Sequence, residues 1–234
     1  MKISIIIPCY NEEENVEELV LKLAGIYNMN NDINFILVNN GSKDKTYELL
    51  NKYSKQYTFI KIINVEINQG YGYGLISGLK FSDGDFVGWI HADMQLDPIN
   101  LINVTNKLKE NNYDKNIFIK GKRNGRPLLD NIFTFGMSLF ETILFKKRIH
   151  DIGAIPVLFY KDMIKYIDGA PKDFSIELYF YCIAKKLGKK IIRVPIILNE
   201  RKAGKSSWNT GIISKFKQSF RIIKASLNIK KNLS

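Results

Sequence analysis

The first residues of the chain constrain its fold most. Ile3-Ser4-Ile5-Ile6-Ile7 is a near-continuous apolar run, which is typical of a strand buried on both faces of a parallel sheet. Further strand-like segments alternate with segments of helical spacing along the chain. The predicted strands are residues 3–7, 34–38, 59–64, 85–90, 116–120, 155–160 and 190–198. The predicted helices are residues 11–24, 44–57, 75–81, 98–110, 131–145 and 173–187. This alternation predicts an α/β fold, a mostly parallel sheet with right-handed crossovers flanked by helices.

Size and composition indicate one ordinary folded domain. The chain has 234 residues, of which 45% are hydrophobic and 25% charged, and this balance excludes a disordered protein. Its two cysteines, Cys9 and Cys182, are far apart, so neither a CxxC metal site nor a disulfide framework is expected. The start lacks the apolar stretch of a signal peptide, and we expect a cytoplasmic location. No segment reaches the roughly 18 uncharged apolar residues of a membrane span.

Positive charge gathers at the end of the sequence. The formal net charge is +12, and residues 201–234 contain nine Lys/Arg and no Asp/Glu. Such a tail could meet nucleic acid, anionic lipid or phosphorylated substrates, or it could only be a solvated surface. No recognised nucleic-acid-reading module accompanies it, so we expect no nucleic-acid partner.

The same tail has a helical pattern. Its apolar residues recur at steps of four, four, three and four, with basic residues on a neighbouring face. This pattern predicts a basic amphipathic helix that attaches peripherally to an anionic membrane surface. The alternative is an apolar face packed on the core with its lysines outside. The apolar row is Ile212, Phe216, Phe220, Ile223 and Leu227.

Four polar motifs each follow a predicted strand. They are Pro8-Cys9-Tyr10-Asn11-Glu12-Glu13, Asn39-Asn40-Gly41-Ser42-Lys43-Asp44, Asn68-Gln69-Gly70-Tyr71-Gly72-Tyr73-Gly74 and His91-Ala92-Asp93-Met94-Gln95. Ligands of parallel sheets bind beyond the carboxyl ends of the strands, so we expect these motifs to share one edge. Singly, each also has a structural interpretation: turn and helix-cap chemistry for the Asn-Gly-Ser motif, and a flexible turn for the glycines. Asp93 alone could equally be a cap residue.

In this order the motifs resemble those of the family 2 glycosyltransferases, and more closely the dolichyl- and polyprenyl-phosphate sugar synthase branch. The family pattern runs P-x-Y-N-E, V-D-D-G-S-x-D-x-T, N-x-G and D-A-D-x-Q. Shorter matches follow at Gly121-Lys122-Arg123, Asp151-Ile152-Gly153 and Val194-Pro195-Ile196, and a final match at residues 201–208. The resemblance covers residues 1 to about 208.

The resemblance implies a GT-A fold over residues 1–208, followed by the basic amphipathic helix or tail at 209–234. It implies that a nucleotide-sugar donor is bound in the first half of the chain, together with Mg²⁺ or Mn²⁺ on its diphosphate. The implied nucleotide-sugar-binding residues are Pro8, Tyr10, Glu12, Asn39, Asn40, Ser42, Gly70 and Asp93. The implied metal ligands are Asp93 and Gln95, with His91 as a further neutral ligand. Residues suited to phosphate of the donor or acceptor are Arg123, Arg201 and Lys205.

Two motifs depart from the family pattern. His91 stands where the family has the first acidic residue of D-A-D, and Asn39-Asn40 stand where it has D-D. Asn is neutral and both donates and accepts hydrogen bonds. His91 removes one anionic group near the metal, and its ring could be a ligand or simply packed; we favour a packed ring. Three consequences of these departures remain open: weaker metal binding, altered donor choice and lost activity.

A transfer with inversion to a hydroxyl group needs a carboxylate that takes the proton. Asp173 is the first candidate for this base, although an Asp there is also a natural helix cap. Asp151 is the second candidate. A lipid-phosphate acceptor would need no base, because its nucleophile is already an anion.

The sequence therefore predicts a metal-dependent, inverting glycosyltransferase at the inner face of the cytoplasmic membrane. The expected acceptor is a polyprenyl phosphate or a lipid-linked or cell-surface glycan. The protein would bind the membrane peripherally, or through a membrane partner or a homo-oligomer. The alternative, motivated by His91 and Asn40, is a catalytically altered nucleotide-sugar-binding protein that acts as a scaffold.

Overall fold

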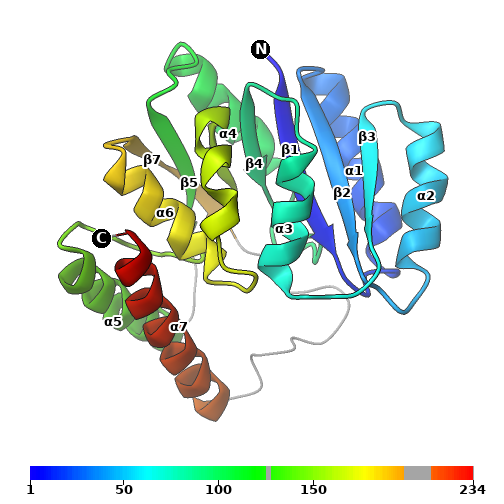
Figure 1. Cartoon of the computed structure of the whole chain (residues 1–234). Helices are drawn as coiled ribbons and strands as arrows, with labels where there is room; N and C mark the ends of the chain where they lie inside the picture. Colours follow the sequence, from blue (N-terminus) through cyan, green and yellow to red (C-terminus); the bar gives the residue numbers. More distant parts are fainter. Residues whose placement is uncertain (125–127, 198–211, 234) are drawn as a thin grey trace.

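A seven-stranded sheet with helices on both faces forms the body of the protein (Figure 1). The computed structural model describes residues 1–124, 128–197 and 212–233. The strands are β1 (Ile3–Cys9), β2 (Ile33–Asn40), β3 (Ile60–Val65), β4 (Phe86–Trp89), β5 (Ile117–Asn124), β6 (Val157–Tyr160) and β7 (Lys190–Ile197). The helices are α1 (Val16–Met29), α2 (Thr46–Gln56), α3 (Tyr71–Lys80), α4 (Asn100–Glu110), α5 (Leu128–Phe145), the 3-10 helix η1 (Lys161–Gly169), α6 (Ile176–Lys186) and α7 (Ile212–Leu233).

The strand order is β3-β2-β1-β4-β6-β5-β7. β6 is antiparallel to both of its neighbours, and the other described pairings are parallel. The predicted α/β class with a mostly parallel sheet is thus confirmed. Because all of these strands except β6 run the same way, the four strand-end motifs and the start of β6 lie at one edge, the lower edge in Figure 1.

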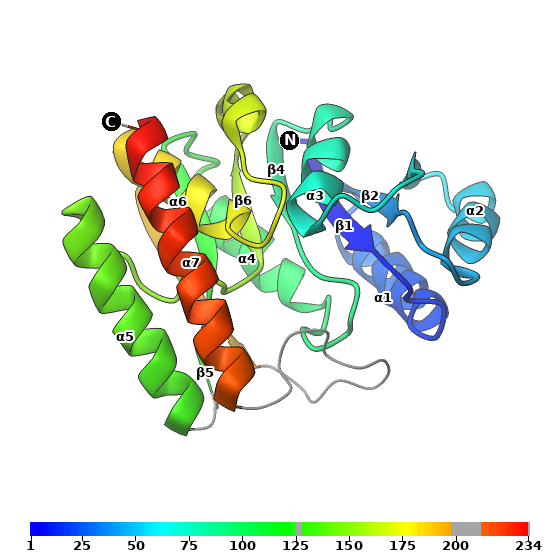
Figure 2. The ribbon, with the colours of Figure 1, turned by 60° about the horizontal axis from the view of Figure 1, so that its bottom comes forward.

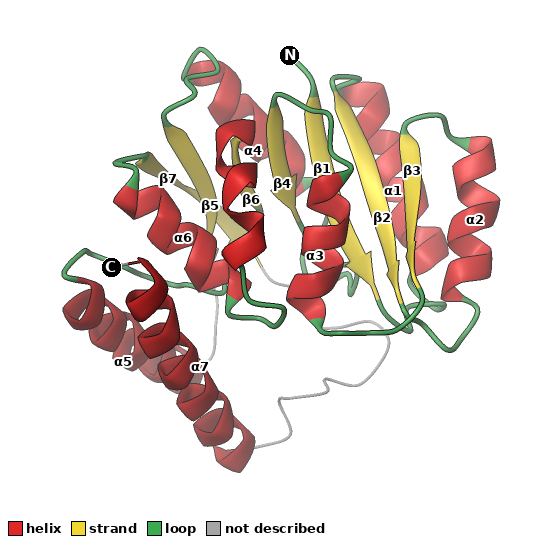
Figure 3. Cartoon of the chain, viewed as in Figure 1, coloured by secondary structure: helices red, strands yellow, loops and turns green. Residues whose placement is uncertain are grey.

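The apolar strands are buried because helices cover both faces of the sheet (Figure 3). Ile5, Ile6 and Ile7 of β1 are completely buried. α3, η1 and α6 lie on one face, and α1 and α4 lie on the other. The first apolar run of the sequence is therefore the centre of the core, as its composition predicted.

The glycine-rich segment differs from its prediction. The helix predicted at 75–81 begins at Tyr71, so Gly72 and Gly74 lie inside α3. A Cβ atom at Gly72 would come within 2.4 Å of the Pro171 carbonyl oxygen. The glycines therefore permit a close approach between the start of α3 and the loop before α6, and the flexible-turn interpretation is wrong.

α5 and α7 lie side by side beyond the carboxyl edge of the sheet (Figure 2). Two polar residues of α5, Ser138 and Glu141, are buried. Ser138 Oγ accepts a hydrogen bond from the Asp151 amide at 3.1 Å, and Glu141 accepts one from the Ser226 hydroxyl of α7. Polar contacts thus hold this helix to the rest of the protein.

The apolar residues of α5 are turned outward instead. They recur at steps of three, four and four, which places them on one side of the helix. Phe135 is 66% exposed and Ile143 69% exposed. We call this set the α5 apolar row. It consists of Ile132, Phe135, Leu139 and Ile143.

Two of the three residues of the predicted tail row whose burial is described, Phe220 and Leu227, are exposed, and the third, Ile223, is partly buried. Phe220 is 70% exposed and Leu227 52% exposed, whereas Ser226 and Ile229 form the buried side of α7. The core-packing alternative therefore fails for Phe220 and Leu227. The side chains of Ile212 and Phe216 lie outside the described residues. Among the described helices, none is both long and apolar enough to cross a membrane.

The buried Glu141 makes a pH-dependent contribution to stability. Burial raises its pKa from 4.5 to about 7, although the hydrogen bond from Ser226 acts in the opposite direction. The folded state then holds this proton more tightly than the unfolded state, so the free energy of unfolding should fall as pH rises from about 4.5 to about 7.

We predict that Glu141→Gln removes this loss, because an amide does not ionise. Thermal and urea unfolding should show similar stability for both proteins near pH 5. Above pH 7 the variant should be more stable by about 1–3 kcal/mol. If the free energy of unfolding varied with pH in the same way for the two proteins, the raised pKa of Glu141 would be contradicted.

Candidate active site

The first and second motifs are joined by hydrogen bonds at the carboxyl edge. The backbone amide of Asn11 donates to Ser42 Oγ at 3.1 Å, and the backbone amide of Lys43 donates to Asn11 Oδ1 at 2.9 Å. The Glu12 amide donates to Thr46 Oγ1 at 2.8 Å. These contacts bring Glu12 and Ser42, from two different strand ends, into one cluster.

Asn39 and Asn40 both use the amide donors that an aspartate lacks. Asn39 Nδ2 donates to Asn64 Oδ1 at 2.7 Å, and its Oδ1 accepts from the Ser42 amide at 3.3 Å. Asn40 Nδ2 donates to the Gly70 carbonyl oxygen at 3.1 Å. Asn40 Oδ1 is buried without a hydrogen-bond partner. The amides in place of the family's acids thus support neighbouring loops, and one acceptor remains unsatisfied.

The third motif receives the loop that carries Asp173. The Tyr73 amide donates to the Lys172 carbonyl oxygen at 3.0 Å. The Phe174 ring stacks on Tyr71 with 4.4 Å between ring centroids, and the His91 ring meets Tyr71 edge-on at 5.1 Å. The third motif, the fourth motif and the start of α6 are therefore in contact.

The fourth motif turns tightly after β4. Asp93 is buried, and its Oδ1 accepts a hydrogen bond from the Gln95 amide at 3.2 Å. Met94 between them has a φ of 57°, in the left-handed region. The His91 ring contacts the Tyr71 and Phe174 rings, and its buried Nε2 has no hydrogen-bond partner among the described residues. Whether this ring is a metal ligand stays a prediction.

These residues fit a divalent metal only in part. In the described part of the chain, no group of three or more His, Cys, Asp or Glu side chains is placed to hold an ion. Mg²⁺ is commonly held by one or two carboxylates together with substrate phosphates. Asp93, Gln95 and the unpartnered Nε2 of His91 suit a site of this kind, in which the diphosphate supplies the remaining ligands.

The two candidate bases have different surroundings. Asp173 is exposed, and its carboxylate accepts hydrogen bonds from the amide of Ser175 at 2.9 Å and from the Ser175 hydroxyl. It therefore stabilises the turn that leads into α6, while its base role stays a prediction. Asp151 is buried in an ion pair with Arg123. Burial raises the pKa of Asp151, but the hydrogen bonds and charge of Arg123 outweigh it and lower the pKa below its usual value. A lowered pKa and the ion pair with Arg123 both make Asp151 a weaker general base.

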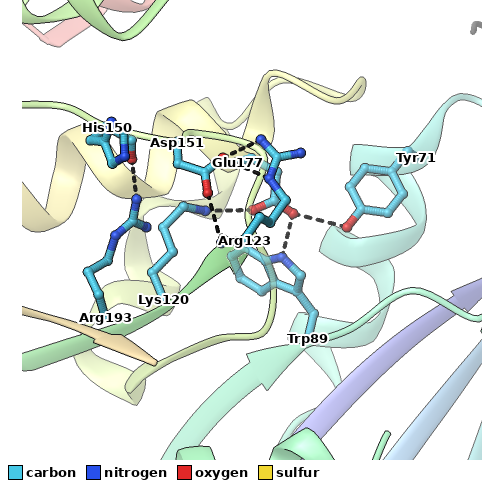
Figure 4. Close-up of polar contacts among 8 residues, drawn as sticks. All are labelled: Tyr71, Trp89, Lys120, Arg123, His150, Asp151, Glu177 and Arg193. Atoms are coloured by element: carbon cyan, nitrogen blue, oxygen red, sulfur yellow. Dashed lines mark hydrogen bonds and ion pairs between the residues drawn. The ribbon is translucent and has the colours of Figure 1, made fainter. Parts of the chain in front are cut away.

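Glu177 lies at the centre of a buried polar network that sequence reasoning missed (Figure 4). Trp89 Nε1 donates to Glu177 Oε1 at 2.6 Å, and the Tyr71 hydroxyl donates to the same oxygen at 3.0 Å. Lys120 Nζ donates to Oε2 at 3.3 Å. The network joins α3, β4, β5 and α6 next to the Arg123–Asp151 pair.

Lys120 is a fully buried cation in the middle of β5. Burial lowers its pKa to about 8, although the Glu177 carboxylate acts in the opposite direction. Two features of the sequence could have indicated this network. One is a lysine inside the apolar run 117–121, and the other is a glutamate early in the largely apolar helix predicted at 173–187. Buried charges are normally paired, so each implied the other.

The remaining predicted residues have simpler positions. Pro8 and Gly70 are partly buried at the carboxyl edge, and the Tyr10 ring is 43% exposed there. Arg123 is held by Asp151 through Nε at 2.7 Å and through its terminal nitrogen. Arg201 and Lys205 lie outside the described residues.

We predict that Glu177→Gln destabilises the protein by about 3–5 kcal/mol, because it leaves Lys120 buried without its counter-charge. The double variant Glu177→Gln/Lys120→Met should regain much of this loss in urea unfolding. The matched control is Glu110→Gln, which breaks the exposed ion pair with Lys107 and should cost less than about 1 kcal/mol. Equal stability of Glu177→Gln and the natural protein would refute the role of the network.

Comparisons with known proteins identify the family of this chain. Residues 4–167 match the family Glycosyl transferase family 2. A dolichol-phosphate mannosyltransferase of Pyrococcus furiosus is 28% identical over 88% of this chain and 59% of its own length. A dolichyl-phosphate beta-glucosyltransferase of Trichomonas vaginalis is 24% identical over 85% of this chain and 66% of its own length. The chain thus spans less than two thirds of either relative.

A solved structure confirms the fold. The glucosyl-3-phosphoglycerate synthase of Mycobacterium tuberculosis, in complex with Mn²⁺, uridine diphosphate and glucosyl-3-phosphoglycerate, superposes with a TM-score of 0.71. It covers 98% of this chain and 80% of its own, at 15% identity. The two dolichyl relatives confirm the resemblance to the polyprenyl-phosphate sugar synthase branch. The chain therefore belongs to Glycosyl transferase family 2 and has the GT-A fold.

Proposed function

We propose that this chain transfers a sugar, with inversion, from a nucleotide-sugar to a membrane-associated acceptor. The observation that carries the proposal is the meeting of the four strand-end motifs at one sheet edge, where the first two are joined by hydrogen bonds. This edge is where parallel α/β sheets bind their ligands. Membership of the family supports the same reaction type.

The donor would lie across the first and second motifs. The exposed Tyr10 ring offers a face for a base. Glu12 and Ser42 offer a carboxylate and a hydroxyl for the nucleoside. The diphosphate would then point toward Asp93 and Gln95 beyond β4. There a bound Mg²⁺ or Mn²⁺ would stabilise the negative charge that develops on the departing nucleoside diphosphate.

The acceptor would enter from the side of β5 and α6. Arg123, Arg201 and Lys205 supply positive charge for a phosphate of the acceptor or donor. A phosphate oxygen could attack the sugar directly, because it is already an anion. For a hydroxyl acceptor, the exposed Asp173 is the base we propose, since Asp151 is already paired with Arg123.

We predict that Asp93→Ala abolishes Mn²⁺-dependent nucleotide binding and leaves the fold intact. Asp93 is the acidic residue that remains in the fourth motif, so no carboxylate of that motif can replace it. Calorimetry with uridine and guanosine diphosphates, with and without Mn²⁺, measures the effect. Asp114→Asn is the control, because Asp114 caps the loop before β5 and should leave binding unchanged. Unchanged Mn²⁺-dependent affinity in Asp93→Ala would remove Asp93 from the metal site.

The scaffold alternative rests on two observations. Asn40 donates to the Gly70 carbonyl oxygen, and the His91 ring packs edge-on against the stacked Tyr71 and Phe174 rings. Release of nucleoside diphosphate from nucleotide-sugars in the presence of Mn²⁺ separates the hypotheses. Turnover supports the transferase, whereas tight binding without turnover supports the scaffold.

We also propose that the protein rests on the inner face of the cytoplasmic membrane through α5 and α7, by itself or with a membrane partner or a second copy. The α5 apolar row is exposed, whereas Ser138 and Glu141 of the same helix are buried. In an ordinary surface helix of a water-soluble protein, the apolar side faces the core and the polar side faces the solvent. On α7, exposed Phe220 and Leu227 lie among exposed Arg221 and Lys224. Apolar and basic residues together suit an anionic bilayer surface.

We predict that the double variant Phe135→Ser/Ile143→Ser binds anionic vesicles roughly tenfold more weakly, because two side chains no longer enter the acyl region. Replacing Arg221 and Lys224 with Gln should instead reduce the salt-sensitive part of binding, to which other basic residues also contribute. Ile67→Ser is the matched control, since Ile67 is 73% exposed in the loop between β3 and α3. Co-sedimentation of Phe135→Ser/Ile143→Ser equal to that of the natural protein would exclude α5 as the contact.

A further inference from the structure

A hollow lies away from the motifs, where α5, α6 and α7 end. Its volume is about 380 Å³. Five lysines line it: Lys146, Lys147, Lys185, Lys186 and Lys230. Its lining residues, all within the described part of the chain, include no Asp or Glu. We call it the lysine cavity.

The rest of the lysine cavity is apolar. Leu144, Phe145 and Ile149 come from α5 and the segment after it, Cys182 from α6 and Leu233 from α7. Burial and the charge of Glu141 raise the pKa of the Cys182 thiol far above its usual value, so this side chain stays neutral. The cavity therefore combines an apolar floor with a cationic rim.

Part of the positive charge has a structural role. Lys147 Nζ donates to the Lys185 carbonyl oxygen at 2.7 Å, and Lys186 Nζ donates to the Leu233 carbonyl oxygen. Both carbonyls belong to helix ends, which carry partial negative charge. Lys146 and Lys185 lie on the same rim, and their ammonium groups add charge beyond these two capping contacts.

The rim retains a positive field after these contacts. Burial and the charges of Lys147, Arg148 and Arg193 all lower the pKa of Lys185, and no acidic group in the described part of the chain offsets them. Glu141 is the acidic residue behind the floor, and its raised pKa of about 7 keeps much of it protonated at neutral pH. A bound anion would relieve this repulsion.

We propose that the lysine cavity binds the phosphate-bearing headgroup of an anionic membrane lipid, with the first part of its apolar chain on the floor. The α5 apolar row ends at Ile143, next in the chain to Leu144 of the cavity wall, so both would meet the same bilayer. Glu177 lies in the first turn of α6 and Lys186 at its last residue, about 14 Å farther along the helix. The site goes beyond the proposed sugar transfer and does not depend on it.

The experiment uses a lipid that dissolves without forming a bilayer. Titration of the whole protein with monomeric dihexanoyl phosphatidic acid, followed by calorimetry, should show saturable binding. Dihexanoyl phosphatidylcholine tests the need for net negative charge. Glycerol phosphate and inorganic phosphate test the need for the apolar chain. We expect each of these three probes to bind at least about tenfold more weakly.

The variant Lys146→Gln/Lys185→Gln keeps the two capping lysines and should fold normally. It should weaken binding of the phosphatidic acid by roughly fivefold for each lysine. The matched control is Lys52→Gln/Lys55→Gln in α2, at the opposite end of the sheet (Figure 1). Circular dichroism and thermal unfolding check that both variants fold.

Three outcomes would overturn the proposal. Equal affinity for glycerol phosphate and phosphatidic acid would mean that the cavity takes a free phosphate. An equal loss of affinity for phosphatidic acid in the two double variants would mean that binding depends on net charge alone. No saturable binding of phosphatidic acid would leave the lysines as helix caps only. None of these outcomes bears on nucleotide-sugar turnover, which is measured separately.

Discussion

One buried carboxylate holds the two halves of the candidate site together. Glu177 accepts hydrogen bonds from Trp89 at the end of β4, from Tyr71 at the start of α3 and from Lys120 in β5. Trp89 is only four residues before Asp93, so the position of the proposed metal ligand depends on this contact. A charge buried so deeply is tolerated only when it is paired and hydrogen-bonded. The network therefore fixes the spacing between the donor motifs and the Arg123–Asp151 pair.

The sequence predicts the central architecture because burial leaves a clear pattern. The apolar run at 3–7 and the alternation of elements suffice for the sheet and its flanking helices. They do not reveal that β6 inserts antiparallel between β4 and β5, because strand pairing depends on contacts far apart in the sequence. They also do not distinguish a flexible glycine turn from a helix start packed against 171–173, since that depends on a distant backbone.

Side-chain roles are harder to predict than positions. The four motifs do lie at one edge, but whether Asn39 and Asn40 weaken the site cannot be judged from residue type. In the structure their amide groups donate to Asn64 and Gly70, which aspartates could not do. Amphipathic spacing likewise identifies two faces of a helix without saying which is buried. On α5 the polar face is inward, because Ser138 and Glu141 bond to Asp151 and Ser226.

The most direct test of the account is a crystal structure of the protein with Mn²⁺ and the nucleoside diphosphate that binds best. The account predicts the diphosphate at the carboxyl edge of β1, β2 and β4, with the metal between its phosphate oxygens and Asp93. The nucleoside should lie against the first and second motifs, near Tyr10 and Ser42. A nucleotide bound elsewhere, for example in the lysine cavity, or a metal held away from Asp93, would contradict the account.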